Sequence, residues 1–153
     1  MIRRFTDNDV DAVGQIWLDA SLIAHDFVSA DFWQADHEVM VSELLPGANG
    51  YVHETEGTID GFVLVAPQQR SNYMGALFVS PQRQGRGIGT QLLDHIKARR
   101  GSLTTSVYKQ NQRTVEFYKS RGFQVVGESV CEHTGCEEYE LEWTGNPDQP
   151  RVS

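Results

Sequence analysis

A glycine-rich stretch, residues 79–89 with the sequence VSPQRQGRGIG, lies between an expected strand and an expected helix. Gly85, Gly87 and Gly89 carry no side chain, so the backbone can turn sharply there and bring successive N–H groups close to a ligand. The first turn of the following helix adds unpaired donors and the positive end of the helix dipole. This combination suits a pyrophosphate. The alternative is a tight turn with a glycine N-cap, which glycine content alone does not exclude.

Two common phosphate-binding loops do not match this stretch. A Walker loop ends in glycine, lysine and serine or threonine, and no lysine follows the glycines here. The dinucleotide fingerprint is G-x-G-x-x-G, whereas residues 85–89 read G-x-G-x-G. If the loop binds phosphate, its conformation therefore differs from both of these loops.

The cysteines form a second pattern with chemical potential. Cys131, His133 and Cys136 make a C-x-H-x-x-C string, but a structural zinc site needs four ligands and no nearby residue offers a fourth. Two cysteines are also too few for a disulfide-stapled secreted scaffold. We therefore expect no metal site and two reduced thiols.

The elements that position these residues follow from apolar periodicity. The spacing predicts a mixed α/β (α+β) fold with a mainly antiparallel sheet and the order β-α-α-β-β-β-α-β-α-β-β. The expected strands are residues 2–5, 51–54, 59–66, 73–79, 103–108, 123–131 and 137–143, and the expected helices are residues 10–21, 31–45, 88–100 and 112–121. Asn111 is the expected N-cap of the last helix.

Size and charge limit the function classes. The chain has 153 residues and 17.2 kDa, which predicts a single domain over residues 1–144 and a flexible tail over residues 145–153. It carries 13 Lys and Arg against 21 Asp and Glu, a net charge of −8, so a nucleic-acid partner is not expected. Neither an apolar run long enough to span a membrane nor a secretory signal is found, so we expect no membrane association and a cytoplasmic location.

These motifs resemble the GNAT N-acetyltransferase superfamily, whose acetyl-coenzyme A loop reads Q/R-x-x-G-x-G/A directly after a β-strand. Gln84, Gly87 and Gly89 match that loop, and residues 117–123 match a later F-Y-x-x-x-G-F pattern. The chain is most similar to the small bacterial single-domain branch that includes lysine acetyltransferases. The resemblance implies the acyl-CoA N-acyltransferase (GNAT) fold and transfer of an acetyl group from acetyl-CoA to a primary amine, in a small molecule or a protein lysine.

The resemblance also implies roles for individual residues. The backbone of the strand before the loop would pair with the pantetheine arm, the loop would wrap the pyrophosphate, Asn111 would contact the cofactor arm, and Tyr118 would protonate the departing thiolate. The implied cofactor-binding residues are Leu77, Phe78, Val79, Gln84, Gly85, Arg86, Gly87, Ile88, Gly89, Thr90 and Asn111.

Tyr118 has suitable chemistry for a general acid. A phenol with a pKa of about 10 holds its proton at neutral pH and can donate it to a thiolate whose conjugate acid has a pKa of about 8.5, given favourable geometry. The alternative is a core tyrosine of an amphipathic helix whose hydroxyl finds a partner.

The general base is less obvious. A lysine amine with a pKa of about 10.4 is almost fully protonated at pH 7, and removing that proton costs roughly 4–5 kcal/mol. Many family members carry a glutamate on the strand before the loop, but residues 72–79 contain no carboxylate. His25 is the first candidate because its ordinary pKa is about 6.5, although it also suits a loop histidine without a catalytic role. The alternatives are a bound water, an amine with a depressed pKa, and the side chains of Asp26, Glu43 and His53.

Other interpretations stay open at this stage. Phe27, Phe32 and Trp33 suit either an acceptor pocket or a helix core. A non-catalytic acyl-CoA-binding sensor is an alternative to the enzyme, and a purely structural protein would bind no coenzyme A. Since a strand that admits a cofactor leaves edges that a second copy could cover, homodimerisation is a further hypothesis.

Overall fold

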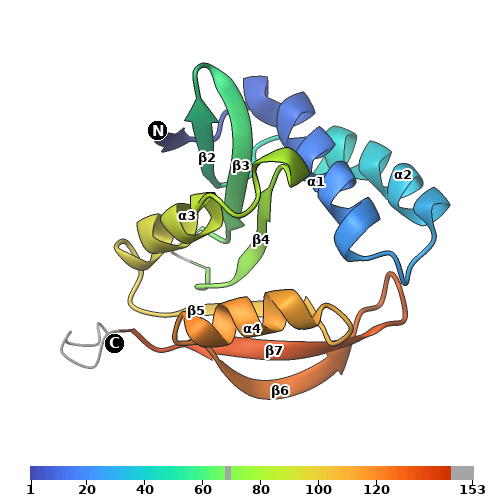
Figure 1. Cartoon of the computed structure of the whole chain (residues 1–153), viewed down its shortest axis with the longest axis vertical. Helices are drawn as coiled ribbons and strands as arrows, with labels where there is room; N and C mark the ends of the chain where they lie inside the picture. Colours follow the sequence, from blue (N-terminus) through green and yellow to red (C-terminus); the bar gives the residue numbers. More distant parts are fainter. Residues whose placement is uncertain (68–69, 146–153) are drawn as a thin grey trace. The chain divides into compact units, whose positions relative to one another are not determined.

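The computed structural model describes residues 1–67 and 70–145. The strands are β1 (Ile2–Arg4), β2 (Gly50–Thr55), β3 (Thr58–Val65), β4 (Met74–Val79), β5 (Leu103–Tyr108), β6 (Gln124–Val130) and β7 (Glu137–Trp143). The α-helices are α1 (Val10–Ala24), α2 (Ala30–Val39), α3 (Ile88–Lys97) and α4 (Gln112–Ser120). Shorter helical segments are η1 (Asp7–Asp9), η2 (Met40–Leu44) and η3 (Pro81–Arg83). The predicted order of strands and α-helices is confirmed (Figure 1).

The chain divides into two compact units. Unit 1 comprises residues 1–65 and 76–95, and unit 2 comprises residues 66–75 and the chain from residue 96 onward. The strands accordingly form a four-stranded sheet in the order β1-β2-β3-β4 and a three-stranded sheet in the order β5-β7-β6. Of the predicted tail, residues 146–153 lie outside the described residues.

The sheet of unit 1 is built on a tight hairpin. β2 and β3 pair antiparallel with Thr55 opposite Thr58, and β1 pairs antiparallel with β2. Glu56 and Gly57 make the turn with φ values of 52° and 81°, as a two-residue type I′ turn requires. In this order β4 is an end strand of its sheet, so one of its edges is not hydrogen-bonded to another strand of that sheet.

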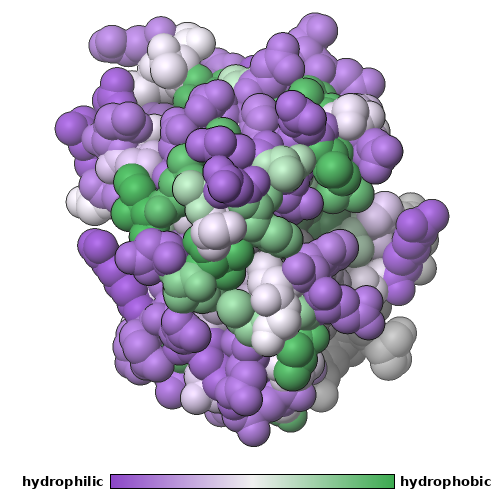
Figure 2. All heavy atoms as spheres, turned by 90° about the vertical axis from the view of Figure 1, so that its right-hand side faces the viewer, coloured by the Kyte–Doolittle hydropathy of each residue, from purple (hydrophilic) through white to green (hydrophobic). Residues whose placement is uncertain are grey.

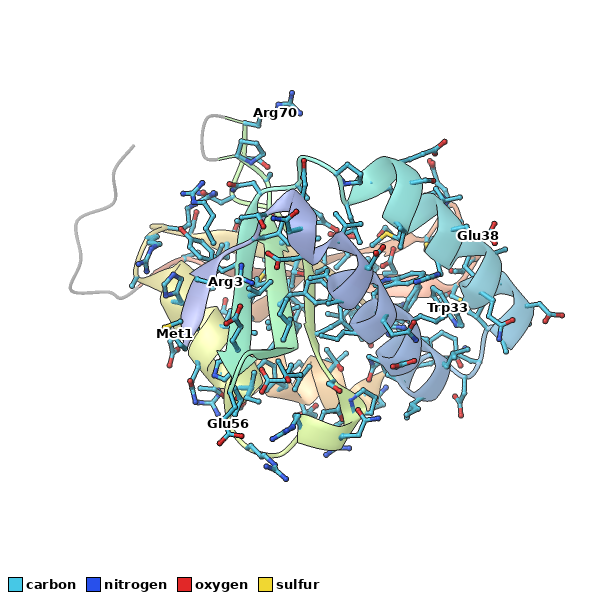
Figure 3. The ribbon with its side chains drawn as sticks, turned by 90° about the horizontal axis from the view of Figure 1, so that it is seen from above. Met1, Arg3, Trp33, Glu38, Glu56 and Arg70 are labelled. Atoms are coloured by element: carbon cyan, nitrogen blue, oxygen red, sulfur yellow. The ribbon has the colours of Figure 1, made fainter. Side chains whose placement is uncertain are left out.

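In unit 1 the helix α1 packs through one apolar stripe, and α2 contacts it through Trp33. On α1, Val13, Ile16, Trp17 and Ala20 recur at helical spacing and are buried. Trp33 lies between α2 and α1, with its ring centroid 5.6 Å from that of Trp17 in an edge-on contact (Figure 3). Both indoles therefore belong to the helix core.

The boundaries of three helices differ from the sequence prediction, and one of them is α3, which ends at Lys97 instead of continuing to residue 100. α1 continues to Ala24 instead of ending near Ser21. The predicted helix 31–45 is divided into α2 and a π-helical segment, η2. This segment leaves Leu44 58% exposed while Leu45 is fully buried.

Unit 2 packs α4 along β5 (Figure 1). β5 and β6 each pair antiparallel with β7, which lies between them. Its core includes Leu103, Val115, Tyr118, Phe123 and Leu141. As predicted, strand pairing is antiparallel between β1 and β2, between β2 and β3, and between β7 and each of its two neighbours.

A buried arginine holds the segment that leads into β4 within unit 2. The Arg100 guanidinium donates hydrogen bonds to the carbonyl oxygens of Ala66 and Ser71 at 2.8 and 3.2 Å, and to Asn72 Oδ1 at 3.1 Å. These acceptors offset the cost of burying the charge. Tyr73 then forms an isolated parallel bridge with Thr104.

The face shown in Figure 2 is mostly hydrophilic, with hydrophobic side chains between the hydrophilic ones. In unit 2 the edge strand β6 exposes Val126 and Val130 at 60% and 59%. Among the described residues, no helix combines the length and apolarity that crossing a membrane requires.

Candidate active site

The glycine loop between β4 and α3 has a backbone that other residues would find strained. Gly85 and Gly87 both have φ of +82°, in the left-handed region, and a Cβ built on either would meet no atom within 4 Å. Glycine is therefore required here by the backbone conformation and not by close packing. The loop consequently presents open space beside its main chain, as a ligand cradle needs.

The loop continues directly into the N-terminus of α3. The carbonyl of Gly87 accepts the Gln91 N–H at 3.0 Å, which is the first bond of the helix. The N–H groups of Ile88, Gly89 and Thr90 lie in the first turn, where a helix supplies no acceptor of its own. These donors and the helix dipole favour an anion.

Both ends of the loop are anchored to β3. The Ser80 N–H donates to the Asp60 carbonyl at 2.8 Å. At the other end Ile88 is buried against Gly61, where an added Cβ would come within 2.9 Å of Ile88 Cγ2. The loop is therefore fixed at its two ends, while Gly85 and Gly87 between them are exposed.

The other predicted cofactor residues of unit 1 lie next to the loop. Leu77, Phe78 and Val79 form the end of β4, the end strand of its sheet, and Arg86 is exposed between the two left-handed glycines. Gln84 donates from its side-chain amide to the Val79 carbonyl at 3.2 Å. This hydrogen bond stabilises the turn at which β4 ends and the glycine loop begins.

His25 lies at the C-terminal end of α1 among aromatic rings. Its ring centroid is 5.5 Å from Trp33, 5.8 Å from Phe27 and 6.3 Å from Phe78. The Trp33 indole N–H also donates to the His25 carbonyl at 3.1 Å. Burial lowers the pKa of His25 to about 4, because the charged imidazolium loses its hydration there. The ring is therefore neutral at pH 7.

The remaining base candidates have different surroundings. Asp26 and Glu43 are exposed. His53 is buried with its Nδ1 2.6 Å from Asp60 Oδ1, and the Thr55 hydroxyl donates to the other carboxylate oxygen at 2.7 Å. This network links β2 to β3, so His53 already has a partner within the sheet.

Tyr118 of unit 2 is buried on the face of α4 that meets β5. It is 4% exposed, and its ring centroid lies 5.0 Å from that of Phe123. Burial raises the pKa of Tyr118 above its ordinary value, and a hydrogen bond with Thr105 acts in the opposite direction. The phenol therefore keeps its proton throughout the neutral pH range.

Thr105 connects Tyr118 to the start of β4. The Thr105 hydroxyl donates to the Met74 carbonyl at 2.9 Å and is also the hydrogen-bonding partner of Tyr118. Thr105 is not among the site residues predicted from the sequence. The alternation along β5 could have indicated it, because Thr105 lies between Leu103 and Val107 on the buried face of that strand.

Asn111 is the N-cap of α4, as predicted. Its side-chain oxygen accepts the Thr114 N–H at 3.3 Å. Unit 1 thus brings His25, the end of β4 and the glycine loop into one part of the fold, whereas Asn111 and Tyr118 both belong to unit 2. Their expected roles with a cofactor stay predictions.

Both cysteines are free thiols. In the part of the chain that the structure describes, no three His, Cys, Asp or Glu side chains are grouped so that they could hold a metal ion.

Comparisons with known proteins agree with these features. The profile of the acetyltransferase (GNAT) domain matches residues 46–125. The peptidyl-lysine N-acetyltransferase YjaB of Salmonella typhimurium is 36% identical over 135 residues, which cover 88% of this chain and 90% of that protein. The solution structure of apo-form YjaB from Escherichia coli superposes with a TM-score of 0.83 at 32% identity, covering 95% of this chain and 98% of that one.

A more distant structure shares the fold. The PaiA N-acetyltransferase from Thermoplasma acidophilum, in complex with coenzyme A, gives a TM-score of 0.75 at 17% identity. It covers 94% of this chain and 98% of its own. The predicted acyl-CoA N-acyltransferase fold is confirmed by these neighbours.

Proposed function

Since this chain belongs to the GNAT acetyltransferase family and is an N-acetyltransferase, we propose that it transfers the acetyl group of acetyl-CoA to the ε-amine of a protein lysine. The observation that carries the proposal is the pair of open, left-handed glycines, Gly85 and Gly87, ahead of α3. Their backbone leaves room for a pyrophosphate next to the donors of a helix N-terminus.

The residues of unit 1 fit acetyl-CoA in two further respects. The exposed Arg86 adds positive charge between the glycines. β4 is an end strand, and the main chain of such a strand can pair with an extended amide-containing arm as it would with another strand. Bound acetyl-CoA supplies the activated thioester; the chain binds it, orients it and manages protons.

A basic protein segment is the acceptor class that the charge distribution favours. Residues 5–69 contain no Lys or Arg and twelve acidic residues, which are Asp7, Asp9, Asp11, Asp19, Asp26, Asp31, Asp36, Glu38, Glu43, Glu54, Glu56 and Asp60. Negative potential of this kind raises the encounter rate with cationic substrates. The relatives named peptidyl-lysine N-acetyltransferases support the same choice.

Tyr118 is the proposed proton donor to the leaving thiolate. Its phenol retains its proton at neutral pH, because burial raises its pKa. Tyr118→Phe should lower kcat by about 10²-fold, the lower end of the range for general acid catalysis, with little change in the Kd for acetyl-CoA. Tyr108→Phe is the matched control and should retain the wild-type kcat. Equal kcat values for the two variants would remove Tyr118 from the mechanism.

Proton removal from the lysine amine is a separate question. Transfer from an ammonium of pKa about 10.4 to an imidazole of pKa about 4 is unfavourable by roughly 9 kcal/mol. The amine is therefore expected to enter already neutral, so that kcat/KM for a lysine peptide rises about tenfold per pH unit below the pKa of the amine. A rate loss in His25→Phe at unchanged acetyl-CoA affinity would instead support His25 as the base.

The decisive experiment pairs two glycine variants with the same backbone strain. Gly87→Ala and Gly57→Ala both place an L-residue at a φ of about +80° in open space, but only Gly87 lies in the glycine loop. We expect calorimetric titration with acetyl-CoA to show tight binding to the wild type and Gly57→Ala, and weakened binding to Gly87→Ala. Mass spectrometry of a lysine peptide should show the gain of one acetyl group in the same order. Absence of acetyl-CoA binding to the folded wild type would refute the proposal.

The expected cytoplasmic location and the expected homodimer stay predictions. Sedimentation across micromolar concentrations tests the second of them: a mass near one chain throughout would contradict the dimer.

A further inference from the structure

The turn between β6 and β7 places the two cysteines of the chain directly opposite each other. Val130 and Glu137 are the last paired residues of the two strands, and the Cys131 N–H then donates to the Cys136 carbonyl at 2.9 Å. Directly opposed residues of an antiparallel pair have Cα atoms roughly 4.5–5.5 Å apart and project their side chains to the same face. Disulfides span roughly 4.4–6.8 Å between Cα atoms, so this position can hold one without moving the strands.

The turn itself keeps the two cysteines in place. Four residues separate them, and the Gly135 N–H donates to the Cys131 carbonyl at 2.8 Å. Gly135 has a φ of +73°, which a glycine adopts without strain. The opposed arrangement therefore exists in the reduced protein and does not have to be created by oxidation.

The two sulfurs have complementary hydrogen-bonding roles. Cys131 Sγ lies 3.5 Å from the Tyr108 hydroxyl, whereas the Cys136 thiol donates to the Thr134 carbonyl at 3.8 Å. Tyr108 holds its proton because burial, reinforced by this contact, raises its pKa. Cys131 therefore has a hydroxyl group as its partner, whereas the partner of Cys136 is a carbonyl oxygen.

The surroundings of Cys131 favour its thiolate. Burial by itself would raise the pKa of Cys131, but hydrogen bonds from Thr134, Tyr108 and the main chain at His133 and Thr134 outweigh it and bring the pKa below its ordinary value. The charged and titratable groups nearby come from the turn, from the residue that follows β5, and from β6 and β7: Glu132, His133, Lys109, Glu128, Glu137 and Glu138. Lys109 forms ion pairs with Glu128 and Glu137 and so offsets two of these carboxylates.

We propose that Cys131 and Cys136 are a redox pair, in which a hydroperoxide oxidises Cys131 and Cys136 resolves the product into an intramolecular disulfide. The Cys131 thiolate attacks the terminal oxygen of the hydroperoxide, the O–O bond breaks, and the sulfur takes the OH group to become a sulfenic acid. An alkoxide leaves, or hydroxide in the case of hydrogen peroxide, and takes up a proton. The Cys136 sulfur then attacks the sulfenic sulfur, an S–S bond forms, and water leaves. Two thiols lose two electrons and two protons, while the hydroperoxide is reduced to water and an alcohol, or to two waters for hydrogen peroxide.

This inference is independent of acetyl transfer. Both thiols are partly exposed, so a small peroxide can reach them. A disulfide that forms only on oxidation is the kind found in reducing compartments, where lasting structural disulfides are rare. The C-x-H-x-x-C string is thereby explained without a metal.

The test treats the full-length reduced protein with hydrogen peroxide and measures intact mass. We expect loss of two hydrogen atoms, a peptide linking Cys131 to Cys136 after digestion, and recovery of the original mass with dithiothreitol. In Cys136→Ser the sulfenic acid should persist at Cys131 and be trapped by dimedone. A disulfide-linked dimer, or independent over-oxidation of the two sulfurs, would overturn the proposal.

A second measurement separates the reactivity of Cys131 from mere proximity. With iodoacetamide at about pH 7, Cys131 should alkylate faster than Cys136, because only the thiolate reacts and hydrogen bonds lower the pKa of Cys131. Tyr108→Phe keeps the aromatic ring and removes one hydrogen-bond donor, so the pH midpoint for Cys131 should rise in that variant. Equal alkylation rates for the two cysteines, or a midpoint that Tyr108→Phe leaves unchanged, would contradict the assigned roles.

Discussion

Replacing His25 by phenylalanine should remove much of the pH dependence of stability between about pH 7.5 and pH 5. In the folded chain burial holds the pKa of His25 at about 4, whereas an unfolded chain gives it about 6.5. The unfolded state therefore binds more protons than the folded state between these values. The free energy of unfolding consequently falls as the pH falls, because protons stabilise the state that binds more of them.

The magnitude follows from the two pKa values. The difference of 2.5 units between 6.5 and 4 corresponds to about 3.4 kcal/mol at pH well below 4, at about 1.36 kcal/mol per unit. At about pH 5 the folded ring is still mostly neutral and the unfolded ring mostly charged, which gives about 2 kcal/mol. Because His25 is only 8% exposed, screening by solvent hardly reduces this free-energy difference.

The assay is urea unfolding at about pH 5, 6 and 7.5, followed by circular dichroism. The wild type should lose about 2 kcal/mol more than His25→Phe from the highest to the lowest pH. Any constant cost of the substitution cancels in this comparison. The carboxylate of Asp9, whose pKa its hydrogen bonds with Arg3 lower to about 2, contributes only below this pH window.

The exposed His133 provides the matched control. His133→Gln should retain the pH dependence of the wild type. If His25→Phe and the wild type lost equal free energy, the neutral, buried imidazole described above would be refuted.

Three further changes test the packing. Gly14→Ala should destabilise the chain by about 1–3 kcal/mol in urea unfolding, since the new Cβ would lie 2.6 Å from Val41 Cγ2; Gly101→Ala, with no atom within 4 Å, should not show this clash. Trp33→Phe loses the buried hydrogen bond to the His25 carbonyl and should cost about 1–3 kcal/mol, and a smaller loss would mean that water replaces it. Thr105→Val should cost a similar amount by leaving a β4 carbonyl without its donor, whereas Thr105→Ser should restore most of the stability.

The elements that the sequence predicted well are those set by local spacing. On α1 the buried Val13, Ile16, Trp17 and Ala20 follow the helical period without reference to any distant residue. The strands predicted at residues 51–54 and 59–66 correspond to β2 and β3, and the turn that joins them depends on Glu56 and Gly57, whose backbone the local sequence largely determines. The glycine loop was recognisable for the same reason.

The features that escaped prediction depend on residues far apart in the chain. The environment of His25 arises from Trp33 and Phe78, and no spacing along the sequence reports that these rings surround it. The contact of Tyr118 with Thr105 likewise joins α4 to β5. Helical periodicity also does not separate α2 from η2, because both keep apolar residues at similar intervals.

The strand order of unit 2 has a consequence for biosynthesis. β5 pairs with β7 and not with β6, which precedes β7 in the chain. While the chain emerges from the ribosome, all residues of unit 1 are available once His95 has been made. β5 has to wait until residues 137–143 have left the exit tunnel, and its backbone stays without this partner during that interval. A nascent chain arrested before β7 therefore contains the glycine loop and Tyr118 but cannot form the three-stranded sheet on which α4 rests, so this part of the molecule folds last.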